Sequence, residues 1–361
     1  MAAEPGMSAR ARNPDGTGEG LAPPGSVAAL PFSDAPLAPW QQRIYLRVVT
    51  ALEAQQLGHA LLLGGAPAMG KREVARRLAM RLLCAKPGAD GFACGECRGC
   101  RLFRAGTHPD LHEISFGLAQ TGNFRSEIIV DQVRALAEWF SLTPQAGGAQ
   151  VAIVCPAEAM NTAAANALLK TLEEPSRDRY LILVSDQPGR LAATIRSRCQ
   201  KLEFRIPLRA EAEAWLRAAG FADPGPALDA ARGHPGVAAD WLANDALALR
   251  ADVLAALNAL AGGRRSPVEL AAAWLADPRA GLRLRFAAEL VHDAVAHQLA
   301  GRKAPGLTMP GDFQKLGDWY DRLNRLREQL PAPALRHDLV LAGLLLEWRG
   351  YFEESAGGAG R

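Results

Sequence analysis

The sequence predicts an α/β protein in which a doubly wound parallel sheet is followed by helical domains. Strand-like apolar runs alternate with helical segments in the first half of the chain, and a glycine-rich turn of P-loop outline follows the first run. Residues 151–154 and 180–184 are apolar throughout, as expected for parallel strands covered on both faces. Strand signals disappear after Pro207, where helical periodicity takes over.

Length, charge and cysteine usage exclude several classes of protein. With 361 residues the chain has room for two or three domains, and its formal net charge of +3 is too small to imply nucleic-acid binding by itself. No apolar run approaches the roughly 20 residues that span a bilayer, and no secretory signal is visible. Four of the six cysteines fall between Cys84 and Cys100, which fits a metal site in a reducing compartment better than disulfides. We therefore expect a cytoplasmic protein that makes no membrane contact.

The predicted elements begin near Pro39. Residues 1–38 are rich in Gly, Pro, Ala and Ser, and we expect a disordered extension because they hold too little apolar surface to offset chain entropy. A helix with apolar residues at helical spacing starts at Pro39 and Trp40. A buried strand over 59–63 then leads into the glycine-rich turn, and a helix over 73–83 follows it.

The α/β domain is predicted to span residues 39–207 and to repeat this alternation. Asp131 is expected to cap a helix over 132–140, and Pro175 to close a helix over 161–174. Its remaining strands are expected at 110–115, 128–130, 151–154 and 180–184.

Two all-helical units are expected after this domain. The first, a small unit over 208–247, includes the glycine-containing breaks at 220–226 and 233–236. The second, over 248–353, is rich in Ala and Leu at helical spacing. The glycine-rich residues 354–361 are expected to form a flexible tail.

Residues 65–72 have the outline of a phosphate-binding loop. Gly65, Gly70 and Lys71 match G-x-x-x-x-G-K-[ST], in which backbone N–H groups cradle phosphate and the final hydroxyl binds Mg²⁺. Arg72 stands where that hydroxyl is required, and a cation repels Mg²⁺ instead of binding it. A glycine-rich turn without a ligand is the competing interpretation, so ATP or ADP binding by these three residues is left open.

The acids that a hydrolysing P-loop site needs are also missing. Acidic residues would hold Mg²⁺ and orient the attacking water at the end of the strand over 151–154. Cys155 and Pro156 occupy that position, and Glu158 comes too late along the chain. Because two parts of the machinery fail together, we expect no intrinsic ATPase activity.

Four closely spaced cysteines predict a structural zinc site. Cys84, Cys94, Cys97 and Cys100 supply the four thiolate ligands that tetrahedral Zn²⁺ takes in closed, non-catalytic sites. An iron–sulfur cluster and a redox pair are the competing interpretations. His108 is a possible substitute ligand, although a structural role before a proline is the simpler interpretation.

Two further segments are specific in sequence. One is NTAAANALLKTLEEP from Asn161 to Pro175, and the other is TIRSRC from Thr194 to Cys199. Following a P-loop and a cysteine insertion, they resemble the DNA polymerase III clamp-loader branch of the bacterial AAA+ family. The resemblance covers about residues 40–207, and the segments at 105–110 and 130–134 support it.

The resemblance implies a role for Arg198. In clamp-loader subunits the arginine of this motif reaches into the ATP site of the adjacent subunit, where a planar cation stabilises charge on the transferring phosphoryl group. Arg198 would then act in trans as an arginine finger while this chain's own site stays silent. Without the surrounding motifs, Arg196 and Arg198 would be interpreted as surface cations. Gly236 also falls where active relatives carry an arginine that senses their own nucleotide.

The resemblance further implies an assembly. The chain would join gamma or tau ATPase subunits and a delta subunit in a five-subunit ring that loads a sliding clamp onto primed DNA. In that ring the unit over 208–247 would be a lid and the unit over 248–353 a collar. Two alternatives stay open: an active ATPase subunit of the same family, and a zinc-dependent DNA-binding repair factor.

Overall fold

The structure is a computed structural model that describes residues 32, 34–116, 126–174, 176–302, 306–308, 313–330 and 336–357. The chain divides into two compact units, Met1–Ala238 and Ala239–Arg361, each of which is described by itself. The small helical domain predicted over 208–247 stays a prediction. The predicted extension over 1–38 lies outside the described residues except at 32 and 34–38.

A five-stranded sheet forms the centre of the first unit, and its order is β2-β3-β4-β1-β5. Every pairing in it is parallel. The α/β class that the apolar alternation predicts is therefore confirmed. The strands are β1 (Ala60–Gly65), β2 (Leu111–Ile114), β3 (Gln150–Val154), β4 (Arg179–Ser185) and β5 (Gln200–Phe204).

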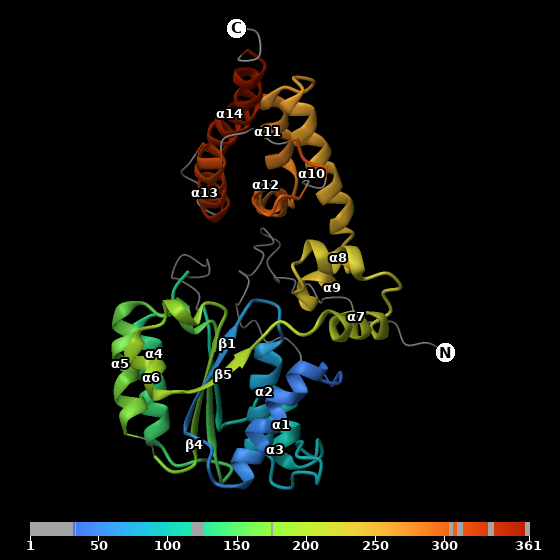
Figure 1. The fold of residues 1–361 in the computed structure, drawn as a ribbon. Coiled ribbons are helices and arrows are strands. Elements are labelled where there is room, and N and C mark those ends of the chain that lie inside the picture. Colours follow the sequence, from blue (N-terminus) through green and yellow to red (C-terminus); the bar gives the residue numbers. More distant parts are fainter. Residues whose placement is uncertain are drawn as a thin grey trace, which may run out of the picture. The chain divides into compact units, whose positions relative to one another are not determined.

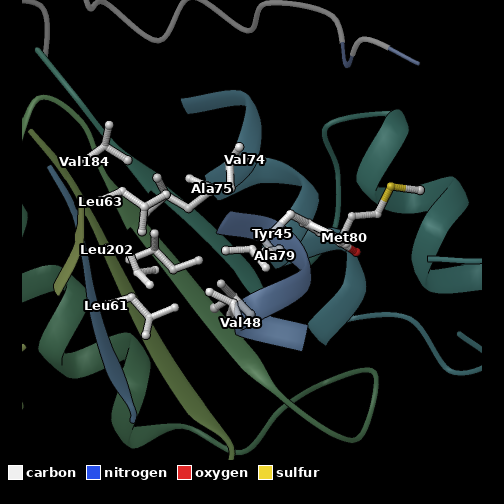
Figure 2. Close-up of a cluster of buried hydrophobic side chains, with 14 of the residues drawn as sticks. Tyr45, Val48, Leu61, Leu63, Val74, Ala75, Ala79, Met80, Val184 and Leu202 are labelled. Carbon is white, nitrogen blue, oxygen red and sulfur yellow. The ribbon is translucent and has the colours of Figure 1, made fainter. Parts of the chain in front are cut away.

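Both faces of the central strands are buried. Leu61 and Leu63 of β1 point into one apolar cluster, whereas Leu62 points into the cluster on the other face. Successive strand side chains point to opposite faces, so a strand covered on both sides must be apolar at every position. Figure 2 shows Leu61 and Leu63 beside Val184 and Leu202, facing Val74 and Ala75.

Helices cover each face of the sheet (Figure 1). The cluster on one face takes side chains from the first three helices, and the cluster on the other face takes them from the next three. The first set is α1 (Pro39–Glu53), α2 (Lys71–Leu82) and α3 (Arg98–Arg104), and the second is α4 (Val130–Ser141), α5 (Thr162–Glu173) and α6 (Ala193–Arg198).

Two details of the predicted elements are wrong. Residues 128–130 form no strand; Ile128 makes one isolated bridge to Met160, and α4 already begins at Val130. The cap of α4 is Ile129, whose N–H donates to Gln132, so Asp131 lies inside the first turn. An acidic residue is favoured both at the N-cap and in the first turn of a helix, so Asp131 does not identify the residue at which α4 begins.

The strand β5 is absent from the predicted elements. From Lys201 to Phe204 its residues alternate between exposed and buried, as in a half-buried strand, but four residues are the shortest run at which this alternation indicates a strand. Exposed charges such as Lys201 and Glu203 are typical of an edge strand, where they discourage pairing with another chain. Pro175, predicted to close α5, lies outside the described residues, and the helix ends at Glu173.

Helices make up the rest of the first unit and the described part of the second. In the second unit, buried Trp319 and Trp348 donate indole N–H bonds to the carbonyls of Leu344 and Leu257, at 2.8 and 3.1 Å. None of the described helices is long and apolar enough to cross a bilayer. The helices are α7 (Arg209–Ala218), α8 (Gly225–Ala230), α9 (Pro235–Ala243), α10 (Ala246–Ala261), α11 (Pro267–Ala276), α12 (Ala280–Leu299), α13 (Phe313–Gln329) and α14 (His337–Gly357). α14 continues past 352, into part of the predicted tail.

Candidate functional site: a closed P-loop, an outlying arginine and a cysteine cluster

The P-loop joins β1 to α2, and the start of α1 holds it in place. Trp40 Nε1 and Gln41 Nε2 both donate to the Met69 carbonyl, each at 3.2 Å. Gly70 lies in the left-handed region at φ 78°, and a Cβ there would fall 2.0 Å from Gln41 Nε2. The turn therefore requires glycine at this position for its backbone angle, while a larger residue would also displace the Gln41 side chain.

Lys71 is buried, with 3% of its surface exposed. Its ammonium donates to the Gly65 carbonyl at 2.7 Å and to the Ala66 carbonyl, and it pairs with Asp186 at 2.6 Å. A lysine ammonium has three N–H donors, and these three acceptors occupy all of them. The charge that would meet phosphate in a nucleotide-binding loop is committed to the protein itself.

Helix α9 packs against the same loop. A Cβ built on Gly236 would fall 1.9 Å from the carbonyl oxygen of Ala68. No side chain fits in that space without a shift of backbone, so the helix approaches the loop only because position 236 is glycine. An arginine that senses a bound nucleotide is absent from this position.

The tip of β3 offers no metal ligand. Burial raises the pKa of the Cys155 thiol to about 11, against the opposing influence of the Arg72 charge, so Cys155 stays protonated at neutral pH. Glu158 Oε1 accepts the backbone N–H groups of Asp186 and Gln187, at 2.9 and 3.3 Å. Glu158 thus supports the turn after β4.

Arg198 lies near the N-terminal ends of the strands, whereas this loop follows the C-terminal end of β1. It ends α6, two residues before β5, and β5 runs parallel to β1 with Leu61 opposite Gln200 and Gly65 opposite Phe204. The P-loop follows Gly65 at the far end of that register. Because parallel strands rise about 3.3 Å per residue, the two ends of the paired segment of β1 and β5 are about 13 Å apart.

The Arg198 guanidinium is held at its own end of the sheet. Its Nη2 pairs with Glu173 at 2.7 Å, and its Nη1 donates to the Thr194 carbonyl at 3.0 Å. The side chain is 37% exposed, so part of the guanidinium faces solvent. In this position the Arg198 guanidinium contacts either a group outside its own P-loop or solvent alone.

The four cysteines predicted as ligands come together. Their sulfur atoms all lie within 4.8 Å of one another, and individual Sγ–Sγ distances are 3.6 Å (Cys84–Cys94), 3.9 Å (Cys94–Cys100) and 4.0 Å (Cys84–Cys97). A tetrahedral zinc ion with bonds of about 2.3 Å requires sulfurs about 3.8 Å apart. The donor set and its spacing therefore fit zinc.

Backbone N–H groups prepare part of this cluster for a cation. Burial raises the pKa of Cys97, but hydrogen bonds from the backbone N–H groups of Cys100 and Ala85 outweigh it and lower the pKa to about 6. Hydrogen bonds from the N–H groups of Glu96 and Cys97 also lower the pKa of Cys94. Thiolates are the species that bind metal.

His108 lies buried near the cysteines but does not belong to their cluster. Its Nδ1 accepts the N–H of Asp110 at 3.1 Å, and Nε2 has no partner among the described residues. The four-cysteine group among the described residues does not include it. The structural role before Pro109 is the one its contacts match.

Two residues of these sites are missing from the sequence-based prediction: Asp186, which pairs with Lys71, and Glu173, which pairs with Arg198. Asp186 directly follows β4, and β4 is the spatial neighbour of β1 although two strands lie between them in sequence. Only knowledge of the strand order would have indicated that it meets the P-loop.

The fold and the site define an α/β domain with a parallel sheet and a P-loop-like turn between β1 and α2, in which Arg72 and Cys155 stand where a hydrolysing loop places Mg²⁺ ligands. Residues 40–207 match the family described as "DNA polymerase III, delta subunit". A DNA polymerase III subunit delta' of Escherichia coli is 32% identical over 328 residues, which are 87% of this chain and 96% of that protein. The chain belongs to the DNA polymerase III subunit delta' family.

Other relatives match about half of the chain. Subunit delta' of Pseudomonas aeruginosa is 44% identical over 54% of this chain, and that of Bacillus subtilis is 38% identical over 48%. These alignments span 57% and 49% of the two relatives, about half of their length. Among solved structures, a gamma subunit-related protein of Thermotoga maritima aligns over 87% of this chain and 99% of its own, with 16% identity and a TM-score of 0.43.

Proposed function

We propose that this chain is a non-hydrolysing subunit of the bacterial DNA polymerase III clamp loader, in which Arg198 completes the ATP site of a neighbouring subunit. The main support for this proposal is that Arg198 lies at the opposite end of the strands from its own P-loop. A guanidinium with unused donors at an exposed edge can follow negative charge that develops on a γ-phosphoryl group next door. Fingers supplied in trans are worth about 10³-fold or more in turnover.

The contacts of the P-loop support the part of the proposal in which this chain does not itself hydrolyse ATP. Lys71 has no donor left for phosphate, and Gly236 occupies the space beside Ala68. Neither Arg72 nor Cys155 can ligate Mg²⁺. We propose that Gly65, Gly70 and Lys71 now stabilise the fold and that neither ATP nor ADP is a resident cofactor.

We also propose partners, a metal and a domain organisation, which membership of the family supports. The partners would be gamma or tau ATPase subunits and a delta subunit, with sliding clamp and primed DNA bound through the ring. Cys84, Cys94, Cys97 and Cys100 would hold structural zinc, which links the insertion to the end of α2. Residues 208–247 would form the lid, and residues 248–353 the collar.

Reconstituted loader tests the role of Arg198. We expect Arg198→Ala to lower clamp- and DNA-stimulated ATP hydrolysis severalfold or more while native mass spectrometry still detects the full ring. Arg198→Lys should not restore activity, because an ammonium lacks the planar fork. Arg205→Ala, which removes another exposed arginine, should change little. Unchanged hydrolysis in Arg198→Ala would contradict the proposal.

Two outcomes would favour the alternatives. Magnesium-dependent ATP turnover by the isolated chain, lost in Lys71→Ala, would identify an active ATPase subunit. Tight, salt-sensitive DNA binding by the isolated chain, lost on removal of zinc, would identify a DNA-binding repair factor.

A further inference from the structure

Helix α5 ends on a carboxylate where helices favour a cation. Glu173 is its last residue, and the C-terminal end of a helix carries partial negative charge. The guanidinium of Arg198, 2.7 Å away, offsets this repulsion. Arg198 itself ends α6, where a cation is favoured. The pair therefore ties the ends of two helices together at the exposed edge that carries Arg198.

The ion pair leaves several N–H donors of the Arg198 guanidinium unused. Arginine has five N–H donors; one on Nη2 points to Glu173 and one on Nη1 to the Thr194 carbonyl. Nε–H and a second N–H on each terminal nitrogen remain. Bidentate binding of a phosphate group takes two donors. Glu173 and a phosphate can thus be bound at the same time.

We propose that Glu173 is the positioning residue for Arg198, holding the guanidinium in the orientation in which it meets the neighbouring subunit's ATP. This inference rests on the proposed role of Arg198. A free arginine side chain has many rotamers, and two fixed acceptors remove most of that freedom before the neighbour's nucleotide arrives. Since the pair is half-exposed, its contribution is modest beside that of the guanidinium itself.

Turnover by the reconstituted ring measures this role. Glu173→Ala should lower kcat for clamp- and DNA-stimulated ATP hydrolysis about twofold to fivefold, as expected for an exposed ion pair, and leave KM for ATP unchanged. Glu173→Asp should restore part of the loss. Glu174→Ala is the matched control, because this adjacent acid has no side-chain hydrogen bond or ion pair among the described residues and should keep full activity.

A double variant separates positioning from a merely structural effect. Glu173→Ala combined with Arg198→Ala should be no slower than Arg198→Ala alone, with ring assembly and melting temperature unchanged. If Arg198→Ala lowers turnover but Glu173→Ala leaves it unchanged or raises it, the positioning role is wrong and the proposed function stands. If Arg198→Ala itself has no effect, the proposed function fails first.

Discussion

Lys71 keeps its ammonium group at a position where only 3% of the side chain is exposed. A buried charge costs several kcal/mol unless it is paired and hydrogen-bonded. Two carbonyls and the Asp186 carboxylate supply that compensation. Lys71 stands at the phosphate-binding position of a P-loop, but its contacts are those of a structural cation.

We predict that Lys71→Met destabilises the protein. It leaves the carbonyls of Gly65 and Ala66 without their donor, which should lower the free energy of unfolding by about 1–3 kcal/mol in chemical denaturation. Lys201→Met, at an exposed position on β5, should stay within about 0.5 kcal/mol of the original protein. Equal stability of the two variants would show that Lys71 is no structural cation.

We expect His112 to make the stability of the protein depend on pH. Burial lowers the pKa of His112, whose ring packs against Trp139 at 5.4 Å between centroids. A histidine with a lower pKa in the folded chain stabilises the fold above its unfolded value, about 6.5, and this stability is lost as the pH falls through the folded value.

His112→Phe keeps a ring against Trp139 but cannot titrate. We expect its free energy of unfolding to fall less steeply between pH 7 and pH 5 than that of the original protein. Identical slopes for the two proteins would contradict the assignment.

The cysteine cluster draws on two helices and the loop between them. Cys84 follows α2, Cys94 lies in the loop after it, and Cys97 caps α3, accepting the N–H of Cys100. A metal here would join two helices and the loop between them without burying much apolar surface, which short irregular segments lack. Phe103, on α3, anchors this insertion in the core.

We predict about one zinc per chain in the purified protein, measured by elemental mass spectrometry. Cys94→Ser should lower bound zinc to near zero, because a structural site needs all four ligands. Proteolysis should then become faster between Cys84 and Cys100. Cys199→Ser removes a buried cysteine outside the cluster and should keep its zinc. Full zinc content in Cys94→Ser would contradict the four-cysteine site.

The chain consists of two compact units. The second contains two close pairs of buried aromatic rings: the ring centroids of Trp319 and Trp348 lie 5.1 Å apart, and those of Trp241 and Phe286 lie 4.9 Å apart. Each unit can therefore lose stability by itself, at the expense of its own contacts only.

Trp348→Ala should destabilise the second unit by about 3–5 kcal/mol, the usual cost of a buried tryptophan. Hydrogen exchange should speed up in the helices of Ala239–Arg361 while the sheet keeps its protection. Leu168→Ala, in the core of the first unit, should give the reverse pattern. Simultaneous loss of protection in both units would indicate one cooperative body.

Local pattern predicted much of the fold. Uninterrupted apolar runs identified the central strands 151–154 and 180–184, since a strand buried on both faces has no polar position. It failed at β5 and at the start of α4, where Lys201 and Asp131 carry signals that fit more than one element. Edge strands and helix starts are where charge, not burial, selects the residue.

The sequence identified the residues of the candidate sites: Arg72, Cys155 and Pro156 where a hydrolysing P-loop places Mg²⁺ ligands, and four cysteines at metal-binding spacing. Only the folded chain shows that Asp186 meets Lys71, that Gly236 meets Ala68 and that Arg198 lies at the opposite end of the strands from the P-loop. The difference comes from the distance along the chain between the residues involved. Residue type and short spacing are properties of neighbours along the chain, whereas these contacts depend on strand order and helix packing, which join segments far apart in sequence.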